Sequence, residues 1–237
     1  MLRTRVLLIT LVGILLHIPF LMSDIHAQPL LSSLASTVDQ LPSVHPDLAR
    51  RETLDRLASW IKMRLLDGRP DPVEVVFICT HNSRRSQLAQ AWMAALAAQA
   101  GWDRIRSFSG GTEVTAFNHR AVQALERAGF QTTIYDELQD NPRYEVKFSP
   151  KSGPMLMFSK RYDYPENPRS GFAAVMVCSD ADTDCPYIPG ADIRIPLPFI
   201  DPKASDGTPE EAATYDLRSG QIAAELAYVI NKIQAHE

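Results

Sequence analysis

The chain has 237 residues, of which 45% are hydrophobic and 22% are charged. These proportions are typical of a globular protein with a buried core and exclude a disordered chain. The net charge of −4 comes without a block of like charges, so no nucleic-acid partner is predicted.

The N-terminus has the pattern of an export signal. Arg3 and Arg5 precede an apolar run over residues 6–22, and the small residue Ala27 follows shortly after it. This order predicts a secretory signal peptide over residues 1–27, and therefore a periplasmic or secreted protein. The alternative is an uncleaved segment in which the apolar run anchors the protein in a membrane. No other membrane contact is predicted.

Residues 28–72 are predicted to be an N-terminal extension with one helix. Residues 28–46 contain several prolines, and we expect them to be poorly structured. From Asp47 to about Asp67, apolar residues recur at helical spacing, namely Leu54, Leu57, Ile61 and Leu65.

Residues 73–237 are predicted to form the main domain. Four apolar segments are expected to be strands: Glu74–Cys79, Arg104–Ser109, Ala173–Cys178 and Ala191–Ile195. Helices are expected from Ser86 to about Ala100, from His119 to about Ala128, and after Thr208. Strands that alternate with helices predict an α/β fold with a parallel four-stranded sheet flanked by helices.

Two further segments of the main domain have their own patterns. Residues 131–170 are polar and rich in proline, which predicts an insertion beside the sheet, with Tyr144–Phe148 and Met155–Phe158 as hairpin strands. Thr208-Pro209-Glu210-Glu211 predicts a capping box with proline at the first helical position. The buried face of that last helix is expected to consist of Ile222, Leu226, Ile230 and Ile233.

Residues 79–86, CTHNSRRS, join the first strand to its helix. Ligands bind at this end of a parallel strand, and the amides of a helix N-terminus favour an anion. The same field is expected to lower the pKa of Cys79 and make it nucleophilic. Arg85 can hold a tetrahedral oxyanion, Ser86 can donate to the thiolate, and Asn82 can brace the loop. The alternative is a structural cysteine that ends a core strand. No nucleotide P-loop, cofactor or metal is predicted.

The loop resembles the signature of the low-molecular-weight protein tyrosine phosphatases and of the thioredoxin-coupled arsenate reductases that share their fold. FSGGTE and AVQALERAGF are similar to the second strand and helix of that superfamily. The resemblance covers residues 73–130 and 172–236. It implies that Cys79 is the nucleophile and that the oxyanion is bound by Thr80, His81, Asn82, Ser83, Arg84, Arg85 and Ser86.

This sequence departs from the superfamily's pattern at three positions. His81 stands where a glycine is usual, and Arg84 adds a second charge to the loop. Gln90 stands where reductases often have a glutamate that contributes to a cation site. We expect Arg84 to point away from the oxyanion and to matter less than Arg85.

The resemblance also implies a role for Asp201-Pro202. In phosphatases of the superfamily, the corresponding aspartate protonates the leaving group, which an alkoxide or phenolate requires. An ordinary Asp-Pro turn is the alternative. Lys203 stands where tyrosine phosphatases usually have an aromatic residue against the substrate ring, and it is less suited to phosphotyrosine.

CSDADTDC, residues 178–185, resembles the redox segment of the arsenate reductases. The resemblance implies a relay in which Cys79 attacks arsenate, Cys178 attacks Cys79, and Cys185 attacks Cys178. A thioredoxin-like reductant then reduces the last disulfide. Residues 179–184 are expected to be a flexible spacer that lets the thiols meet.

Two other interpretations stay open. In an oxidising compartment, Cys178 and Cys185 could form a static disulfide, which would leave an exported phosphatase with Cys79 as its nucleophile. The chain could also be a binding module that holds phosphate or arsenate without turnover. The sequence favours the arsenate reductase.

Overall fold

The computed structural model describes residues 27–136, 140–184 and 187–235. The predicted signal peptide lies outside these ranges apart from Ala27, as does the alternative anchor over residues 6–22, so export stays a prediction. Cys185 also lies outside them. Within the described ranges, no helix is long and apolar enough to cross a membrane.

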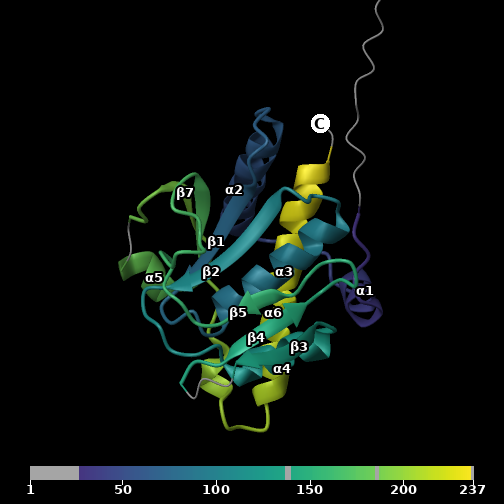
Figure 1. The fold of residues 1–237 in the computed structure, drawn as a ribbon, viewed down its shortest axis with the longest axis vertical. Coiled ribbons are helices and arrows are strands. Elements are labelled where there is room, and N and C mark those ends of the chain that lie inside the picture. The colour runs from purple at the N-terminus through teal and green to yellow at the C-terminus, as the bar shows by residue number, and fades with distance from the viewer. Residues whose placement is uncertain (1–26, 137–139, 185–186, 236–237) are drawn as a thin grey trace, which may run out of the picture.

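The centre of the molecule is a parallel four-stranded sheet (Figure 1), which confirms the predicted fold class. Its strand order is β2-β1-β6-β7. Strand β1 lies inside the sheet, and six of its seven residues are buried. Because the strands are parallel, their carboxyl ends meet at one edge, where ligands bind in such folds. The strands are β1 (Val73–Cys79), β2 (Ile105–Gly111), β6 (Phe172–Met176) and β7 (Ala191–Pro196).

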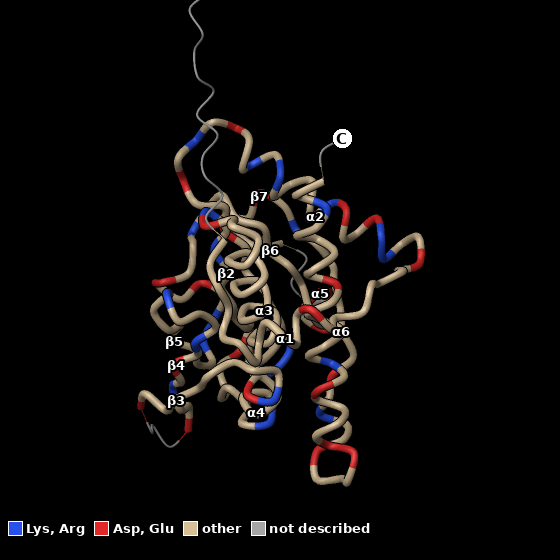
Figure 2. The backbone as a smooth tube through the Cα atoms, turned by 90° about the vertical axis from the view of Figure 1, so that its right-hand side faces the viewer, with Lys and Arg blue, Asp and Glu red and all other residues tan. Residues whose placement is uncertain are grey.

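Helices flank the sheet and supply most of the remaining core. α3 packs on β1 and β2, α2 packs on β7 and β1, and α6 contacts α2, α3 and α4. The four predicted core residues of α6 are all buried, and in Figure 2 charged residues of both signs are interspersed along α2. The helices are α2 (Leu48–Leu66), α3 (Arg85–Gln99), α4 (His119–Ala128) and α6 (Glu211–Gln234).

The predicted capping box of α6 is wrong in its details. The helix begins at Glu211, three residues later than Thr208. The Thr208 hydroxyl donates to the Ser205 carbonyl and does not cap a helical N–H group. The Glu211 carboxylate instead accepts from the Gly207 N–H at 2.5 Å, because a tight turn brings that amide to the helix N-terminus.

The extension is more ordered than predicted. A second helix, α1 (Ser32–Asp39), lies within the segment expected to be poorly structured. Leu34 of α1 is fully buried, and the Ser33 hydroxyl donates to the Gly129 carbonyl at the end of α4. Gly129 has a φ of 105°, and a Cβ there would lie 2.4 Å from the Leu34 nitrogen. Only glycine therefore permits this docking.

The insertion forms a three-stranded antiparallel sheet rather than a hairpin. Its strands are β3 (Gln131–Asp136), β4 (Arg143–Lys147) and β5 (Met155–Met157), in the order β3-β4-β5. The two predicted strands are present. Strand β3 was not predicted because most of its side chains, including Ile134 and Tyr135, are exposed, so it lacks an apolar pattern.

Residues 179–184 were predicted to be a flexible spacer, and this is wrong in the structure. They form the short helix α5 (Ser179–Asp184), which directly follows Cys178. The Cys178 carbonyl accepts from the Asp182 N–H at 3.1 Å, so the first helical turn closes on the cysteine itself. The polar sequence SDADTD carries too little apolar spacing to indicate a helix.

Candidate active site

Cys79 is the last residue of β1 and lies directly before the loop that leads into α3. Its thiol is buried, and its Sγ lies 3.1 Å from the Ser86 hydroxyl oxygen. The same oxygen accepts from the Asn82 side-chain amide at 2.8 Å. Either the thiol or the hydroxyl can donate in the Cys79–Ser86 contact, and a Ser86 hydroxyl that donates to the sulfur would stabilise a thiolate.

Asn82 holds the middle of the loop in an unusual backbone conformation. Its φ is 46°, a left-handed value that asparagine tolerates better than most residues. Its side chain is fully buried, and Oδ1 accepts from the Lys160 N–H at 2.9 Å and from the Gln87 amide at 3.2 Å. The loop shape therefore depends on side-chain contacts from α3 and from the insertion.

A strap of the insertion, residues 158–160, fastens the loop from outside. The Ser159 hydroxyl donates to the His81 carbonyl at 2.8 Å. The Gln87 amide donates to the Phe158 carbonyl, also at 2.8 Å. The Asn141 side chain pairs with both the N–H and the carbonyl of Ser159. The sequence did not indicate that the strap contacts the loop, because the two segments are about 80 residues apart.

The two glycines of FSGGTE allow these segments to approach. A Cβ at Gly111 would lie 2.6 Å from the Thr80 carbonyl oxygen and 2.8 Å from the Asn82 nitrogen. A Cβ at Gly110 would lie 2.2 Å from the Tyr162 Cα. Side chains at either position would push the catalytic loop or the chain after the strap away from β2.

Arg85, the first residue of α3, is brought together with Asp201. One guanidinium nitrogen donates to the Asp201 carboxylate at 2.7 Å and the other to the Phe199 carbonyl at 2.8 Å. Arginine has five N–H donors, so three remain for an oxyanion. Asp201 also accepts from the Lys203 N–H at 3.0 Å, which fixes the carboxylate at the start of a short 3₁₀ turn.

Arg84 makes a different set of contacts. Its Nε donates to the Tyr215 hydroxyl of α6 at 2.7 Å, and an Nη lies 3.3 Å from the Asp206 carboxylate. Tyr215 donates to that carboxylate at 2.7 Å. Burial, together with the Asp206 hydrogen bond, raises the pKa of Tyr215 to about 12. The sequence did not identify Tyr215 and Asp206 as supports of the loop, since nothing in their local pattern indicates it.

A second thiol lies beside the loop. Cys178 follows β6, the neighbour of β1, and is a buried, free cysteine. Its Sγ lies 3.6 Å from the Thr80 hydroxyl and accepts from the Ala181 N–H at 3.3 Å. The structure therefore places two of the three cysteines at adjacent strand ends.

A cleft of about 410 Å³ adjoins the loop. It combines basic side chains with an aromatic one from the insertion; among its lining residues are His81, Arg84, His119, Tyr144 and Lys203. His81 also lies 3.3 Å from the Glu113 carboxylate. Among the described residues, no cluster of His, Cys, Asp and Glu could hold a metal ion. Cys79, Arg85 and Asp201 do not line this cleft, so it lies next to the loop and not around the nucleophile itself.

Residues 74–142 match the family model of the low molecular weight phosphotyrosine protein phosphatases. An arsenate reductase of Staphylococcus aureus (strain bovine RF122 / ET3-1) is 28% identical over 116 residues, which cover 48% of this chain and 67% of that protein. The arsenate reductase of Staphylococcus aureus strain N315 is 28% identical over 120 residues, 50% of this chain and 70% of the relative.

Solved structures of the same two kinds resemble the chain more distantly. A low molecular weight phosphotyrosine phosphatase from Vibrio cholerae O395 aligns with a TM-score of 0.44 and 16% identity, over 67% of this chain and 94% of the other. An arsenate reductase in the phosphate-binding state aligns with a TM-score of 0.44 and 18% identity, over 68% and 98%. By sequence, the chain is therefore similar to the low molecular weight phosphotyrosine protein phosphatases and to arsenate reductases, and the family model covers the strand, loop and helix that carry Cys79.

Proposed function

We propose that the protein is an arsenate reductase that uses Cys79, Cys178 and Cys185 in relay. The observation that carries this proposal is the buried thiol of Cys178, 3.6 Å from the hydroxyl of Thr80, the residue after the nucleophile. Phosphoester hydrolysis needs one cysteine, whereas reduction needs a second thiol within reach of the first. The relatives named arsenate reductase support the same choice.

In the first steps, the protein supplies a nucleophile and hydrogen-bond donors that bind the oxygens of arsenate. The Cys79 thiolate attacks the arsenic of arsenate, and one oxygen leaves as water. Amides at the start of α3 and the free donors of Arg85 hold the remaining oxygens. Cys178 then attacks the Cys79 sulfur. The electron pair of the sulfur–arsenic bond stays on arsenic, which leaves as arsenite, and a Cys79–Cys178 disulfide remains.

We expect the last step to unwind α5. Cys185 must attack Cys178, but the six residues between them are helical and advance the chain by roughly 9 Å at about 1.5 Å per residue. A disulfide needs its Cα atoms within about 7 Å. Unwinding would allow the Cys178–Cys185 bond to form and would carry it outward, where a thioredoxin-like dithiol could reduce it.

A phosphatase is the second candidate, because Asp201 is paired with Arg85 at 2.7 Å. This contact keeps the Asp201 carboxyl group beside the Arg85 guanidinium that would bind the oxyanion, where the carboxyl group could protonate a leaving group. Tyr144 lines the cleft beside the loop and could contact an aromatic substrate where Lys203 cannot. In this reaction Cys79 would form a phosphocysteine that water hydrolyses, and Cys178 would take no part.

Single-turnover chemistry separates the two candidates. Without external reductant, the reduced wild type should release one arsenite per chain and end with a 178–185 disulfide. Cys185→Ser should trap a Cys79–Cys178 disulfide after one arsenite, and Cys178→Ser should release none. Cys79→Ser is the control and should be inert to arsenate and to phenyl phosphate. A 178–185 bridge that persists after strong reduction, with no arsenite and with phenyl phosphate hydrolysis, would favour the phosphatase.

We also propose that the protein is exported and cleaved after Ala27. In support, the next residue, Gln28, is already part of the fold: its N–H donates to the Ala98 carbonyl at 2.9 Å and its side chain donates to Asp103. A mature chain that begins there would lose no described contact of the domain. Mass spectrometry of protein from the exported fraction should find Gln28 at the N-terminus, and an intact N-terminus would overturn cleavage.

A further inference from the structure

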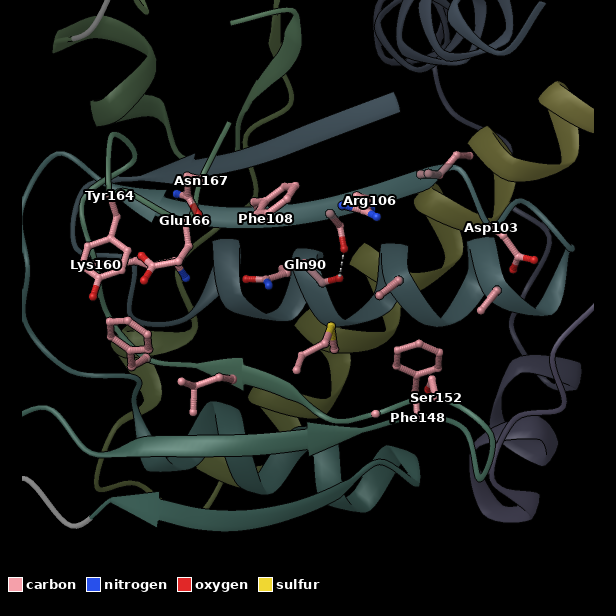
Figure 3. Close-up of a pocket in the computed structure, with 18 of the residues that line it drawn as sticks. Gln90, Asp103, Arg106, Phe108, Phe148, Ser152, Lys160, Tyr164, Glu166 and Asn167 are labelled. Carbon is pink, nitrogen blue, oxygen red and sulfur yellow. Dashed lines mark hydrogen bonds between the residues drawn. The ribbon is translucent and has the colours of Figure 1, made fainter. Parts of the chain in front are cut away.

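A second cavity lies between α3, β2 and the sheet of the insertion (Figure 3). Its volume is about 540 Å³, within the range of small-molecule sites. Apolar side chains form much of its lining, including Phe108, Phe148, Met155 and Phe158. In Figure 3, Lys160, Tyr164, Glu166 and Asn167 gather at one end. This cavity exists only because the insertion covers α3, and it is separate from the cleft beside Cys79.

Lys160 is the charged group that sets the cavity's chemistry. It is 6% exposed, and among the described residues its ammonium has no hydrogen bond and no ion pair within 4.0 Å. The ammonium does lie over the Phe158 ring, whose centroid is 5.1 Å from Nζ. Burial lowers its pKa to about 8, against the opposing effect of the Glu166 carboxylate. The Nζ atom is not among the fully enclosed polar atoms that lack a partner, so the ammonium faces the cavity, where a ligand carboxylate could reach it.

Other buried polar atoms around the cavity also lack partners. Asn167 is 4% exposed, and its amide nitrogen donates to the carbonyls of Ser109 and Tyr162, but its Oδ1 accepts nothing from the described residues. Trp102 Nε1, which can only donate, and Ser152 Oγ also line the cavity and make no hydrogen bond with the described residues. Such atoms are nearly always satisfied in folded proteins, by protein, water or ligand.

We propose that this cavity binds a small carboxylic acid with an apolar body. The carboxylate would pair with the Lys160 ammonium, and the body would lie along Phe108 and Met155. Arg106 and Arg143 also line the cavity, and Asp103 and Glu166 oppose them, so the lining carries three positive and two negative side chains and its net charge of +1 matches one negative charge. A phosphate with two charges would exceed this net charge, and Glu166 at the same end would repel it more strongly than it repels a carboxylate. Asn167 Oδ1 would accept from water or from a polar substituent of the ligand.

The test uses 4-phenylbutyrate as the probe, with 4-phenylbutan-1-ol as its neutral counterpart, and calorimetry on the full domain. The carboxylate should bind at least tenfold more tightly than the alcohol. Lys160→Met keeps the length of the side chain but removes the charge, and it should abolish this preference. Lys151→Met removes an exposed lysine of the same insertion and should leave binding unchanged.

A second variant keeps the lysine and fills the space. Ala94→Phe on α3 should block both probes, and circular dichroism should verify that each variant is folded. If Lys160→Met does not fold, the wild-type preference for the acid and its loss in Ala94→Phe decide the question. Equal binding of acid and alcohol, no binding of the acid, or unchanged binding in Ala94→Phe would each overturn the proposal. None of these readouts depends on catalysis.

Discussion

Two adjacent arginines differ in what surrounds them. Arg85 shares its guanidinium between Asp201 and the Phe199 carbonyl and keeps three donors free. Arg84 is held by Tyr215 and Asp206, and its Nε also lies 4.0 Å from the Asp201 carboxylate that pairs with Arg85. The Arg85 guanidinium can therefore still bind a ligand through its free N–H groups. The contacts of Arg84, in contrast, fix the loop to α6.

We therefore expect Arg85→Ala and Arg84→Ala to fail in different ways. Loss of Arg85 should weaken phosphate binding and turnover by on the order of 2–5 kcal/mol, because a charge-assisted bidentate contact disappears. Loss of Arg84 should mainly lower the free energy of unfolding, by about 1–3 kcal/mol, since buried partners lose their hydrogen bonds. Calorimetry with phosphate and urea unfolding measure the two effects, and Tyr215→Phe is the matched control for Arg84. Equal losses of phosphate affinity in both variants would contradict this division.

The sequence predicted the residues of the loop better than the residues that hold it. Cys79, Asn82 and Ser86 lie within eight positions, so one helix N-terminus and one spacing suffice to predict their contacts. Tyr215 and Lys160 reach the loop from 131 and 78 residues away. No local pattern encodes such pairings, because they depend on where the insertion and α6 settle on the sheet.

Among the helices and strands, the elements that the sequence predicted correctly are those with regularly spaced apolar residues. The four strands of the central sheet and helices α2, α3 and α4 were predicted to within about two residues, because each buries a continuous face. α1 and α5 were missed for the opposite reason. Leu34 and Ala181 are the only buried residues of these two helices among the side chains that the structure describes, so their sequences look like loops.

The contacts of α5 lead to a prediction about the relay. Arg194 of β7 makes an ion pair with Asp182 at 2.7 Å and also donates to its carbonyl, so it holds the helix against the sheet. If α5 must unwind, Arg194→Met should speed formation of the 178–185 disulfide after arsenate is added. A partly exposed pair contributes up to about 1 kcal/mol, so the rate should rise by about two- to fivefold.

Quenched alkylation and mass spectrometry would follow the conversion of the 79–178 disulfide into the 178–185 disulfide. Arg127→Met is the control. It removes the ion pair between Arg127 of α4 and Asp216 of α6, which at 2.7 Å is as short as the Arg194–Asp182 pair, and it should leave this rate unchanged. A rate that is the same in Arg194→Met and in the wild type would show that unwinding of α5 does not control the step.

Across the whole molecule, hydrogen bonds join the extension to the end of the insertion's strand β4 and the insertion to the loop after Cys79. The Leu31 N–H donates to the Phe148 carbonyl, and the Ser149 hydroxyl donates to the Pro29 carbonyl. The strap then continues to Asn82 of the catalytic loop. Segments that lie outside the resemblance therefore determine the shape of the site, and a buried lysine lies at their junction with the domain.

Because Lys160 is buried, the free energy of unfolding should depend on pH. Burial lowers the pKa of Lys160 from 10.5 to about 8, so below pH 8 the folded state carries the full cost of a desolvated charge. Between about pH 8 and 10.5 the folded state has released this proton and the unfolded state has not. The unfolded state then binds more protons, and the free energy of unfolding should rise with pH, by on the order of 3 kcal/mol in total.

Lys160→Met should lack this rise and should be more stable than the wild type at pH 7, with the gap closing towards pH 10.5. Other groups, such as the buried tyrosines, titrate alike in both proteins, so the difference between the two urea-unfolding curves isolates Lys160. Lys151→Met should follow the wild type at every pH, because its side chain is exposed. A gap that does not change with pH would mean that the ammonium is already compensated in the free protein, and the argument for a missing partner would fail with it.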